Sequence, residues 1–380
     1  MKKVLKIVGV IVLFIGLAFA FSPYYLKRAL IYQYVDIDDH DIFETRTIKT
    51  GNPLSWKLAK NYNNYTISDS LKKKIEGYKT VAFLVIQNDS IKFEEYWDGY
   101  SDSSLSNAFS ATKSIVSLLI GCAIDDGKIK SIEQKVIDFF PEFNGEYGKD
   151  LCIKDLLTMS SGLNWDESYG SPFSKTTQAY YGNDLRKLIF DLKVTEKPAE
   201  KFNYLSGNTQ LLGFILQKAT EKNLAEYASE KIWKPIGAQH DALWYLDKKD
   251  GMEKAYCCFT SNARDFARIG KLLLDSGSCN GNQVISSSYI AKLFQPDTLL
   301  LDENNKKVDY YSLHWWIVDY NGMKITYARG ILGQYIFVIP EMNAIVVRLG
   351  HERDKAYKSH HPLDVYTYLK AASNILKNNK

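Results

Sequence analysis

The sequence predicts an α+β fold in which one antiparallel sheet is built from both ends of the chain, with a helical insertion between them. Two β-rich runs lie within residues 81–96, and four more lie within residues 314–349. Between these two groups, apolar residues recur at helical spacing. Short strands joined by tight turns pair antiparallel, so each group predicts part of one sheet.

The chain begins with a segment typical of export signals. Three lysines among the first six residues precede an apolar run over residues 7–21, and the first acidic residue is Asp36. The sequence Ala18-Phe19-Ala20 fits a cleavage site, whereas the stretch over 4–26 is long enough to span a bilayer. Residues 1–26 are therefore predicted to be a cleaved signal or a membrane anchor, and the protein is expected in the cell envelope or periplasm.

The folded body is predicted to begin after a polar connector. Residues 27–80 are rich in Asn, Asp and Lys, with one short helical stretch around Leu71–Ile75. The body is expected to cover residues 81–380, and its first element is a β-hairpin with strands over 81–86 and 91–96.

The helical insertion and the closing strands follow in order. A helix is predicted within residues 107–127, where Gly127 provides a left-handed cap. Further helices are predicted at residues 153–159, 208–220, 224–231 and 263–276. An antiparallel meander follows at residues 314–320, 324–328, 335–339 and 344–349, and a helix over 363–377 closes the chain.

Composition excludes several function classes. The net charge is +4 and the three N-terminal lysines account for most of it, so the body has no basic footprint for nucleic acid. Adjacent Cys257 and Cys258 are poorly placed to bridge one another, and Cys122, Cys152 and Cys279 complete an odd set without a C-x-x-C pair. The six histidines show no metal-ligand spacing. We therefore expect no disulfide framework, no metal and no organic cofactor.

The first candidate for chemistry is the sequence Ser110-Ala-Thr-Lys113. Residues three apart are neighbours on one helix face, so the hydroxyl and the amine lie close together. A buried lysine that loses its proton can serve as the base for a serine nucleophile. The same pattern occurs at Ser70 and Lys73, but in an exposed basic stretch. A helix cap beside a snorkelling lysine is the structural alternative for Ser110.

The second candidate is the sequence Tyr204-Leu-Ser206, just before a predicted helix. Residues two apart in an extended chain point to the same side, so the phenol and the hydroxyl can face one site. A phenol beside a lysine amine can relay a proton to a leaving group. A capped helix with a core tyrosine is the alternative.

The third candidate is the sequence Gly330-Ile-Leu-Gly333 at the end of a predicted strand. Two glycines let the backbone approach a ligand closely, and a backbone N–H group here could form an oxyanion hole with that of Ser110. Two glycines alone indicate only a strand bend or a turn.

Taken in order, Ser-x-x-Lys, Tyr-x-Ser and Gly-x-x-Gly on a late strand resemble the serine β-lactamase and penicillin-binding-protein superfamily. The chain is most similar to the class C β-lactamase-related branch that includes 6-aminohexanoate-dimer hydrolases. Supporting stretches lie at residues 156–163, 262–270 and 333–340, and the resemblance covers about residues 81–350. It implies a β-lactamase/transpeptidase-like fold.

This resemblance implies a role for each motif residue. Ser110 is the acylated nucleophile, Lys113 is its general base and Tyr204 is the proton relay. The oxyanion is expected between the backbone N–H groups of Ser110 and Ile331.

The resemblance also implies a substrate site. Ser206 is expected to contact the substrate or Lys113, and Tyr169 to close over a bound amide. Gly330 and Gly333 are expected beside the substrate. Where superfamily members have Lys-Thr-Gly, this chain has Ala328-Arg329-Gly330, and the missing lysine favours a neutral substrate over a β-lactam. No deacylating base is identified.

The sequence therefore predicts a serine hydrolase that cleaves an amide or ester bond in a small molecule through an acyl-enzyme. Two alternatives stay open. One is a D-alanyl carboxypeptidase or β-lactamase that acts at the cell wall. The other is a catalytically inactive relative that binds envelope components with the same cleft.

Overall fold

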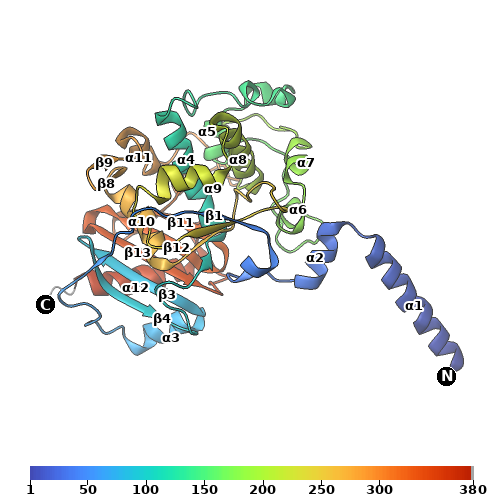
Figure 1. Ribbon diagram of the computed structural model, residues 1–380, viewed down its shortest axis with the longest axis horizontal. Coiled ribbons are helices and arrows are strands. Elements are labelled where there is room, and N and C mark those ends of the chain that lie inside the picture. The colour runs from blue at the N-terminus through green and yellow to red at the C-terminus, as the bar shows by residue number, and fades with distance from the viewer. Residues whose placement is uncertain (378–380) are drawn as a thin grey trace.

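A computed structural model of the chain describes residues 1–377 and contains a seven-stranded sheet with strand order β10-β11-β12-β13-β3-β4-β2 (Figure 1). The strands are β2 (Lys57–Leu58), β3 (Thr80–Gln87), β4 (Ser90–Tyr96), β10 (Trp316–Tyr320), β11 (Met323–Gly330), β12 (Gln334–Ile339) and β13 (Ala344–Gly350). Neighbours pair antiparallel, except that β2 pairs parallel with β4. Strands β3 and β13 join the two ends of the chain, which confirms the predicted architecture.

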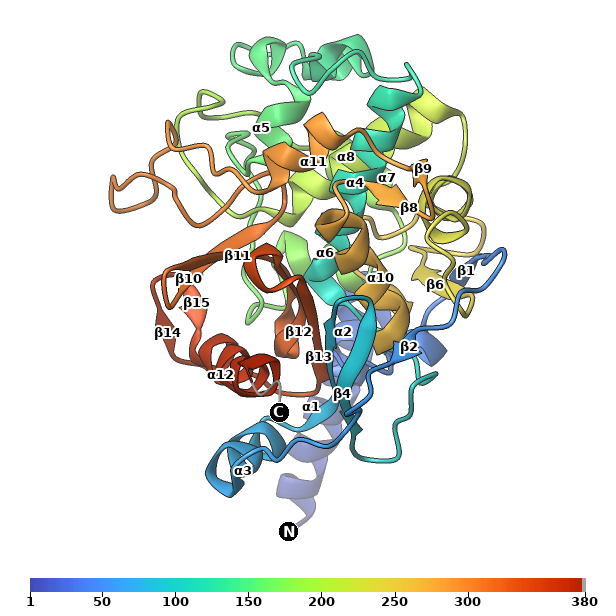
Figure 2. The same cartoon turned by 90° about the vertical axis from the view of Figure 1, so that its left-hand side faces the viewer.

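The sheet is buried on both faces because side chains alternate along each strand. In β3, Leu84 and Ile86 pack into one core, whereas Phe83 and Val85 pack into the other. The helix α10 (Ala263–Leu274) contacts β12 and β13 on one face. The helices α3 (Asp69–Gly77) and α12 (Leu363–Lys377) cover the opposite face (Figure 2).

The predicted helical insertion forms a second layer above the first face. Its central pair is α4 (Thr112–Asp125) and α8 (Ser206–Thr220), which pack against each other and are almost entirely buried. The other helices are α5 (Ile153–Leu157), α6 (Lys175–Tyr181), α7 (Leu185–Phe190), α9 (Leu224–Ala228) and α11 (Ser287–Leu293). The insertion thus begins and ends beside the sheet and leaves the N-termini of α4 and α8 near the sheet edge.

The structure differs from the prediction over residues 27–80, which are not a bare connector. This stretch contains β1 (Thr45–Ile48), which pairs with β6 (Ala242–Tyr245) in a second sheet of order β1-β6-β7-β5. The remaining strands of that sheet are β5 (Ser106–Asn107) and β7 (Phe259–Ser261). Ile48 is fully buried there, and its partners lie far along the chain, so no local pattern could reveal the pairing. Two short hairpins, β8 (Ser278–Cys279) with β9 (Asn282–Gln283) and β14 (Tyr357–Lys358) with β15 (His361–Pro362), complete the strands.

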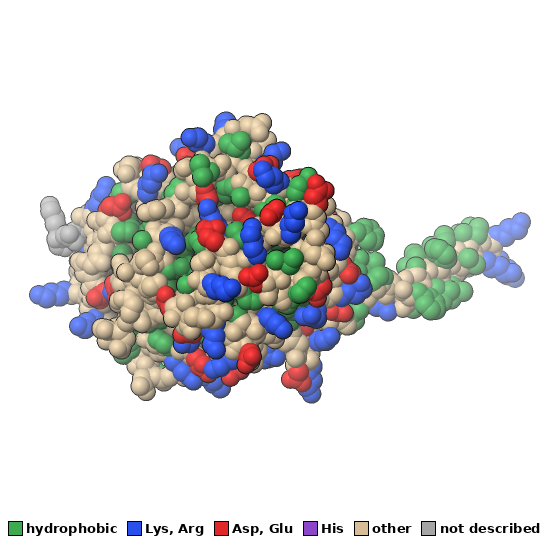
Figure 3. Space-filling view, turned by 90° about the horizontal axis from the view of Figure 1, so that it is seen from above, with side chains coloured by type: hydrophobic (Ala, Val, Ile, Leu, Met, Phe, Trp, Pro, Cys, Tyr) green, Lys and Arg blue, Asp and Glu red, His purple; other side chains and the backbone are tan. Residues whose placement is uncertain are grey.

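The N-terminal helix α1 (Lys2–Phe21) projects away from the body, and none of its residues is buried (Figure 3). It is the one helix among residues 1–377 that is long and apolar enough to cross a membrane. A second helix, α2 (Tyr24–Tyr32), follows after Ser22 and Pro23 and packs against α6.

A buried arginine ties the sheet to the turn after β11. Arg348 in β13 donates hydrogen bonds to the backbone carbonyls of Leu332 (2.6 Å), Gly333 (2.7 Å), Tyr78 (2.7 Å) and Glu352 (2.8 Å). Gly333 has φ +89°, and a Cβ atom there would lie 2.1 Å from the guanidinium, so this position requires glycine. Arg348 therefore fixes the turn over residues 331–333 relative to the strands.

We predict that Arg348→Met lowers the free energy of unfolding by about 3–5 kcal/mol, because it leaves several inward-facing carbonyls without a donor. Urea unfolding measures this change. Arg186→Met is the matched control, since Arg186 is exposed and stacks on Phe190. Equal destabilisation by the two substitutions would show that the buried hydrogen bonds contribute little.

Candidate active site

Ser110 lies at the point where the chain leaves β5 and enters the helical layer. It belongs to the short helix η2 (Phe109–Ala111), directly before α4. Phe109 has φ +45°, a left-handed conformation that costs energy in a bulky residue, and its N–H group donates to Asn107 Oδ1 at 2.8 Å. This sharp entry places Ser110 at the open start of a buried helix.

Lys113 is buried one turn further along and makes three hydrogen bonds. Its Nζ lies 3.0 Å from Ser110 Oγ, 3.2 Å from Ser206 Oγ and 2.9 Å from the backbone carbonyl of Tyr256. The side chain is 2% exposed. The structure thus brings the Ser-x-x-Lys motif and Ser206 together around one nitrogen atom.

A carboxylate that sequence reasoning missed completes this network. Ser206 donates its hydroxyl hydrogen to Glu167 Oε1 at 2.7 Å and its backbone N–H group to Glu167 Oε2 at 2.6 Å. Tyr169 donates its hydroxyl to Glu167 Oε1 at 2.6 Å. In the sequence, Glu167 is marked only by its position two residues before Tyr169. Glu167 thus links Tyr169 and Ser206, and through Ser206 it faces Lys113.

Tyr204 lies beside Lys113 but makes a different contact from the one expected of a relay. The centre of its ring is 5.0 Å from Lys113 Nζ, and the ring packs against Trp316 at 5.6 Å. Within residues 1–377, no hydrogen bond joins the Tyr204 hydroxyl to Ser110 or Lys113. The relay role of Tyr204 stays a prediction.

The two glycines of the third motif pack against protein rather than against the pocket. A Cβ atom on Gly330 would lie 2.2 Å from the Ala108 carbonyl oxygen, and Gly333 packs against Arg348. The residues between them, Ile331 and Leu332, line the pocket together with Ser110. Gly330 and Gly333 therefore let the turn approach the start of the Ser110 helix, and their contact with substrate stays a prediction. The oxyanion role of the Ser110 and Ile331 backbones stays a prediction.

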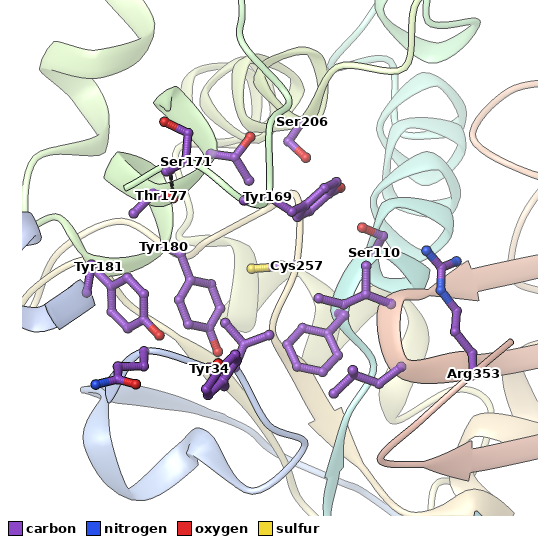
Figure 4. Close-up of a pocket in the computed structure, with 18 of the residues that line it drawn as sticks. Tyr34, Ser110, Tyr169, Ser171, Thr177, Tyr180, Tyr181, Ser206, Cys257 and Arg353 are labelled. Atoms are coloured by element: carbon purple, nitrogen blue, oxygen red, sulfur yellow. Dashed lines mark hydrogen bonds between the residues drawn. The ribbon is translucent and has the colours of Figure 1, made fainter. Parts of the chain in front are cut away.

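Ser110 opens into a pocket of about 1000 Å³. Ser110, Tyr169 and Ser206 lie toward one end, and Tyr34, Tyr180 and Tyr181 lie toward the other (Figure 4). Residues 352–355 add two acids and two bases that alternate in sign along one edge. The pocket is therefore rich in aromatic rings and has little net charge along this edge.

A neutral histidine lies beside the lysine. Burial first, and then the neighbouring Lys113, lower the pKa of His314 from 6.5 to about 3. Its Nε2 atom is 2.9 Å from Thr209 Oγ1, and its backbone carbonyl accepts a hydrogen bond from Ser114 Oγ at 2.7 Å. His314 is thus uncharged at neutral pH.

The structure corrects the expectation for the adjacent cysteines, because Cys257 and Cys258 form a disulfide. Neighbouring cysteines can close a small ring when the backbone between them turns, and Cys258 has φ +74°. Cys257 lines the pocket and follows Tyr256, whose carbonyl accepts from Lys113. Trp244 Nε1 donates to the Cys257 carbonyl at 3.1 Å. The disulfide thus restrains the segment that holds the lysine.

The competing Ser-x-x-Lys motif lies elsewhere. Ser70 and Lys73 are both exposed on α3, on the opposite face of the sheet from the insertion. Within residues 1–377, no cluster of three or more His, Cys, Asp or Glu side chains has the arrangement of a metal site. The chemistry available in the pocket is therefore that of a serine hydroxyl beside a buried amine.

The chain is similar to known proteins over most of its length. The family model described as Beta-lactamase matches residues 69–361. The 6-aminohexanoate-dimer hydrolase of Paenarthrobacter ureafaciens is 25% identical over 309 residues, which are 77% of this chain and 78% of that protein. Protein flp of Staphylococcus aureus is 29% identical over 137 residues, 35% of this chain and 27% of that protein.

Solved structures share the fold. A Bacillus anthracis protein assigned to the 6-aminohexanoate-dimer hydrolases superposes with a TM-score of 0.77 at 22% identity, over 93% of this chain and 95% of that one. A family VIII carboxylesterase superposes with a TM-score of 0.65 at 17% identity, over 87% of this chain and 100% of that one. The predicted β-lactamase/transpeptidase-like fold is confirmed.

We predict that reduction of the Cys257–Cys258 disulfide slows the reaction of Ser110 with a fluorophosphonate about tenfold, the cost of loosening one hydrogen bond to Lys113. The labelling rate, measured by intact mass with and without a phosphine reductant, tests this. The Cys257→Ser/Cys258→Ser variant should be slow under both conditions. The Cys279→Ser variant, which alters a free cysteine, should behave like the wild type. Unchanged labelling after complete reduction would contradict the positioning role.

Proposed function

Because the chain belongs to the beta-lactamase family of serine hydrolases, we propose that it cleaves an amide or ester bond through an acyl-enzyme on Ser110. The observation that carries this proposal is the contact of 3.0 Å between Lys113 Nζ and Ser110 Oγ. In the first step the Ser110 oxygen attacks the carbonyl carbon, and its proton passes to Lys113. The leaving amine or alcohol then takes a proton, and Tyr204 is the proposed relay. Water finally releases the carboxylic acid from Ser110.

The hydrogen bonds of Lys113 suit a base. The Tyr256 carbonyl can only accept, and Ser206 gives its single hydroxyl hydrogen to Glu167, so Ser206 Oγ also accepts from Lys113. A neutral amine has two N–H groups and one lone pair. Those two acceptors take the two N–H groups, and the lone pair is left for the hydroxyl of Ser110.

Glu167 is the proposed positioning residue of this arrangement. By accepting the hydroxyl hydrogen of Ser206, it keeps that oxygen an acceptor for Lys113. Its second oxygen accepts the backbone N–H of Ser206 and thereby fixes the start of α8. Glu167 also holds Tyr169, the proposed gate of the pocket, by a hydrogen bond of 2.6 Å.

The pocket favours a neutral amide or ester over a β-lactam or a D-alanyl peptide. Ala328 stands where relatives have lysine, and the neighbouring Arg329 stacks on Trp316 with its guanidinium carbon 3.2 Å from the ring centre. It also donates to the backbone carbonyl of His360 at 2.9 Å, and it does not line the pocket. No cation from this strand therefore faces Ser110, and Arg353, which lies beside Ser110 in Figure 4, is flanked in sequence by Glu352 and Asp354.

We further propose that the protein is exported and that α1 remains as its membrane anchor. The helix is apolar, 20 residues long and unburied, which suits a bilayer span. The Cys257–Cys258 disulfide fits an oxidising compartment outside the cytoplasm.

We predict that a fluorophosphonate adds once to the wild-type protein and not to Ser110→Ala, because the Ser110 hydroxyl can give its proton to Lys113, whereas Ser206 gives its hydroxyl hydrogen to Glu167. Intact-mass spectrometry of the folded proteins measures the adduct. The matched control is Ser70→Ala, which removes the serine of the exposed motif and should be labelled like the wild type. A folded wild-type protein that takes up no probe would favour the catalytically inactive, binding relative.

We predict that Glu167→Gln lowers kcat on a short acyl ester about tenfold to hundredfold with little change in KM. The glutamine amide can donate to Ser206, which turns the Ser206 hydroxyl hydrogen toward Lys113 and disturbs the base. Steady-state kinetics at several pH values separate this effect from a general loss of folded protein. Asp166→Asn, which neutralises the adjacent carboxylate, should retain normal kcat. Equal kcat values of the two variants would show that Glu167 does not position Ser206 and Lys113 for catalysis.

A further inference from the structure

The wall of the pocket that faces Ser110 comes from the segment next to the membrane anchor. Ala29, Gln33, Tyr34 and Val35 line this wall, and all four belong to α2 or directly follow it. Tyr34 is 84% exposed and projects into the far end of the pocket (Figure 4). The substrate entrance is therefore built partly from residues just beyond α1.

Several contacts hold α2 on the body. The guanidinium carbon of Arg28 lies 4.8 Å from the ring centre of Phe43, and an Arg28 nitrogen donates to the Ile42 carbonyl at 2.5 Å. The rings of Tyr32 and Tyr181 stack with centres 6.3 Å apart. Because Tyr181 itself lines the pocket, these contacts fix α2 relative to the site.

The spacing along the chain places this wall near the bilayer surface. Only Ser22 and Pro23 separate α1 from α2, so the start of α2 lies within about 10 Å of the end of α1. The nine residues of α2 add about 14 Å at the helical rise. With α1 across a membrane, the end of α2, which Gln33 directly follows, then lies within roughly 25 Å of the bilayer surface.

The side chains around this wall suit a membrane interface. Leu30 and Ile31 on α2 are 51% and 61% exposed, and Phe173, just before the helix α6 that packs against α2, is 68% exposed. None of the three lines the pocket. Figure 3 shows apolar side chains on the part of the body from which α1 leaves. Exposed aliphatic and aromatic residues next to a spanning helix are typical of the zone where headgroups meet acyl chains.

We propose that the pocket opens toward the membrane surface and that the substrate is an amphiphilic ester or amide whose aliphatic chain partitions into the bilayer. This inference rests on the proposed function and names its substrate class. Ser110 would attack the carbonyl and release the alcohol or amine with one proton, and water would then release the fatty or acyl carboxylic acid. The aromatic lining of the pocket provides an apolar path for the chain from the bilayer to Ser110.

The test compares two p-nitrophenyl esters with the full chain in vesicles of phosphatidylethanolamine and phosphatidylglycerol. The butyrate stays in water, whereas the palmitate partitions into the vesicles. We expect the Leu30→Ser/Ile31→Ser variant to lose about tenfold in kcat/KM on the palmitate and to keep its rate on the butyrate. The matched control is Leu299→Ser, because Leu299 is 85% exposed and lies outside the pocket. It should keep both rates.

The outcomes separate the two proposals. A wild-type protein that hydrolyses neither ester overturns the proposed function. A wild-type protein that hydrolyses the butyrate but not the palmitate overturns only the membrane inference, as do equal palmitate rates in the double variant and the control. If the double variant does not fold, Phe173→Ser gives the same comparison from the segment that precedes α6. The inference is also overturned if the mature protein isolated from its own host lacks α1 because the segment has been cleaved.

Discussion

The amine of Lys113 makes hydrogen bonds to groups from three parts of the chain: Ser110 before α4, Ser206 at the start of α8, and the Tyr256 carbonyl before β7. A buried amine tolerates this position only if its N–H groups find acceptors, because an unpaired polar group in the interior is costly. The packing of α4 against α8 brings the first two groups together. The disulfide-linked turn and Trp244 hold the third. The interior of the helical layer is thus organised around one nitrogen atom.

Four residues near this centre have sparsely populated backbone conformations. Phe109, Cys258, His314 and Leu332 have φ values of +45°, +74°, +64° and +60°. Each such residue costs of order 1–3 kcal/mol, so the surrounding structure must hold it in place. Asn107 holds Phe109, the disulfide restrains Cys258, and Arg348 holds the turn that contains Leu332. These conformations lower the stability of the fold, and they fix the arrangement of the backbone around Ser110.

The sequence allowed much of the fold to be predicted, because the sheet strands and long helices carry strong local patterns. The predicted strand at residues 335–339 and the predicted helix at 263–276 match β12 and α10 within two residues. The pairing of β1 with β6 could not be predicted, since Thr45 meets Tyr245 across a long stretch of chain. Ser110, Lys113 and Ser206 could be identified from motif order. Glu167 could not be identified, because it lies in a loop whose sequence has no periodic pattern. Tyr256 could not be identified either, because it contacts Lys113 through its backbone carbonyl, which every residue type has.

If Lys113 takes the proton of Ser110, its loss must slow acylation, and the rate of acylation in a single turnover measures this step. With excess enzyme and a short p-nitrophenyl ester, the release of p-nitrophenol reports formation of the acyl-enzyme alone. General-base catalysis contributes about 10²–10⁴-fold, so Lys113→Ala should acylate slower by a factor in that range while still binding the ester. A folded Lys113→Ala protein that acylates at nearly the wild-type rate would contradict the account.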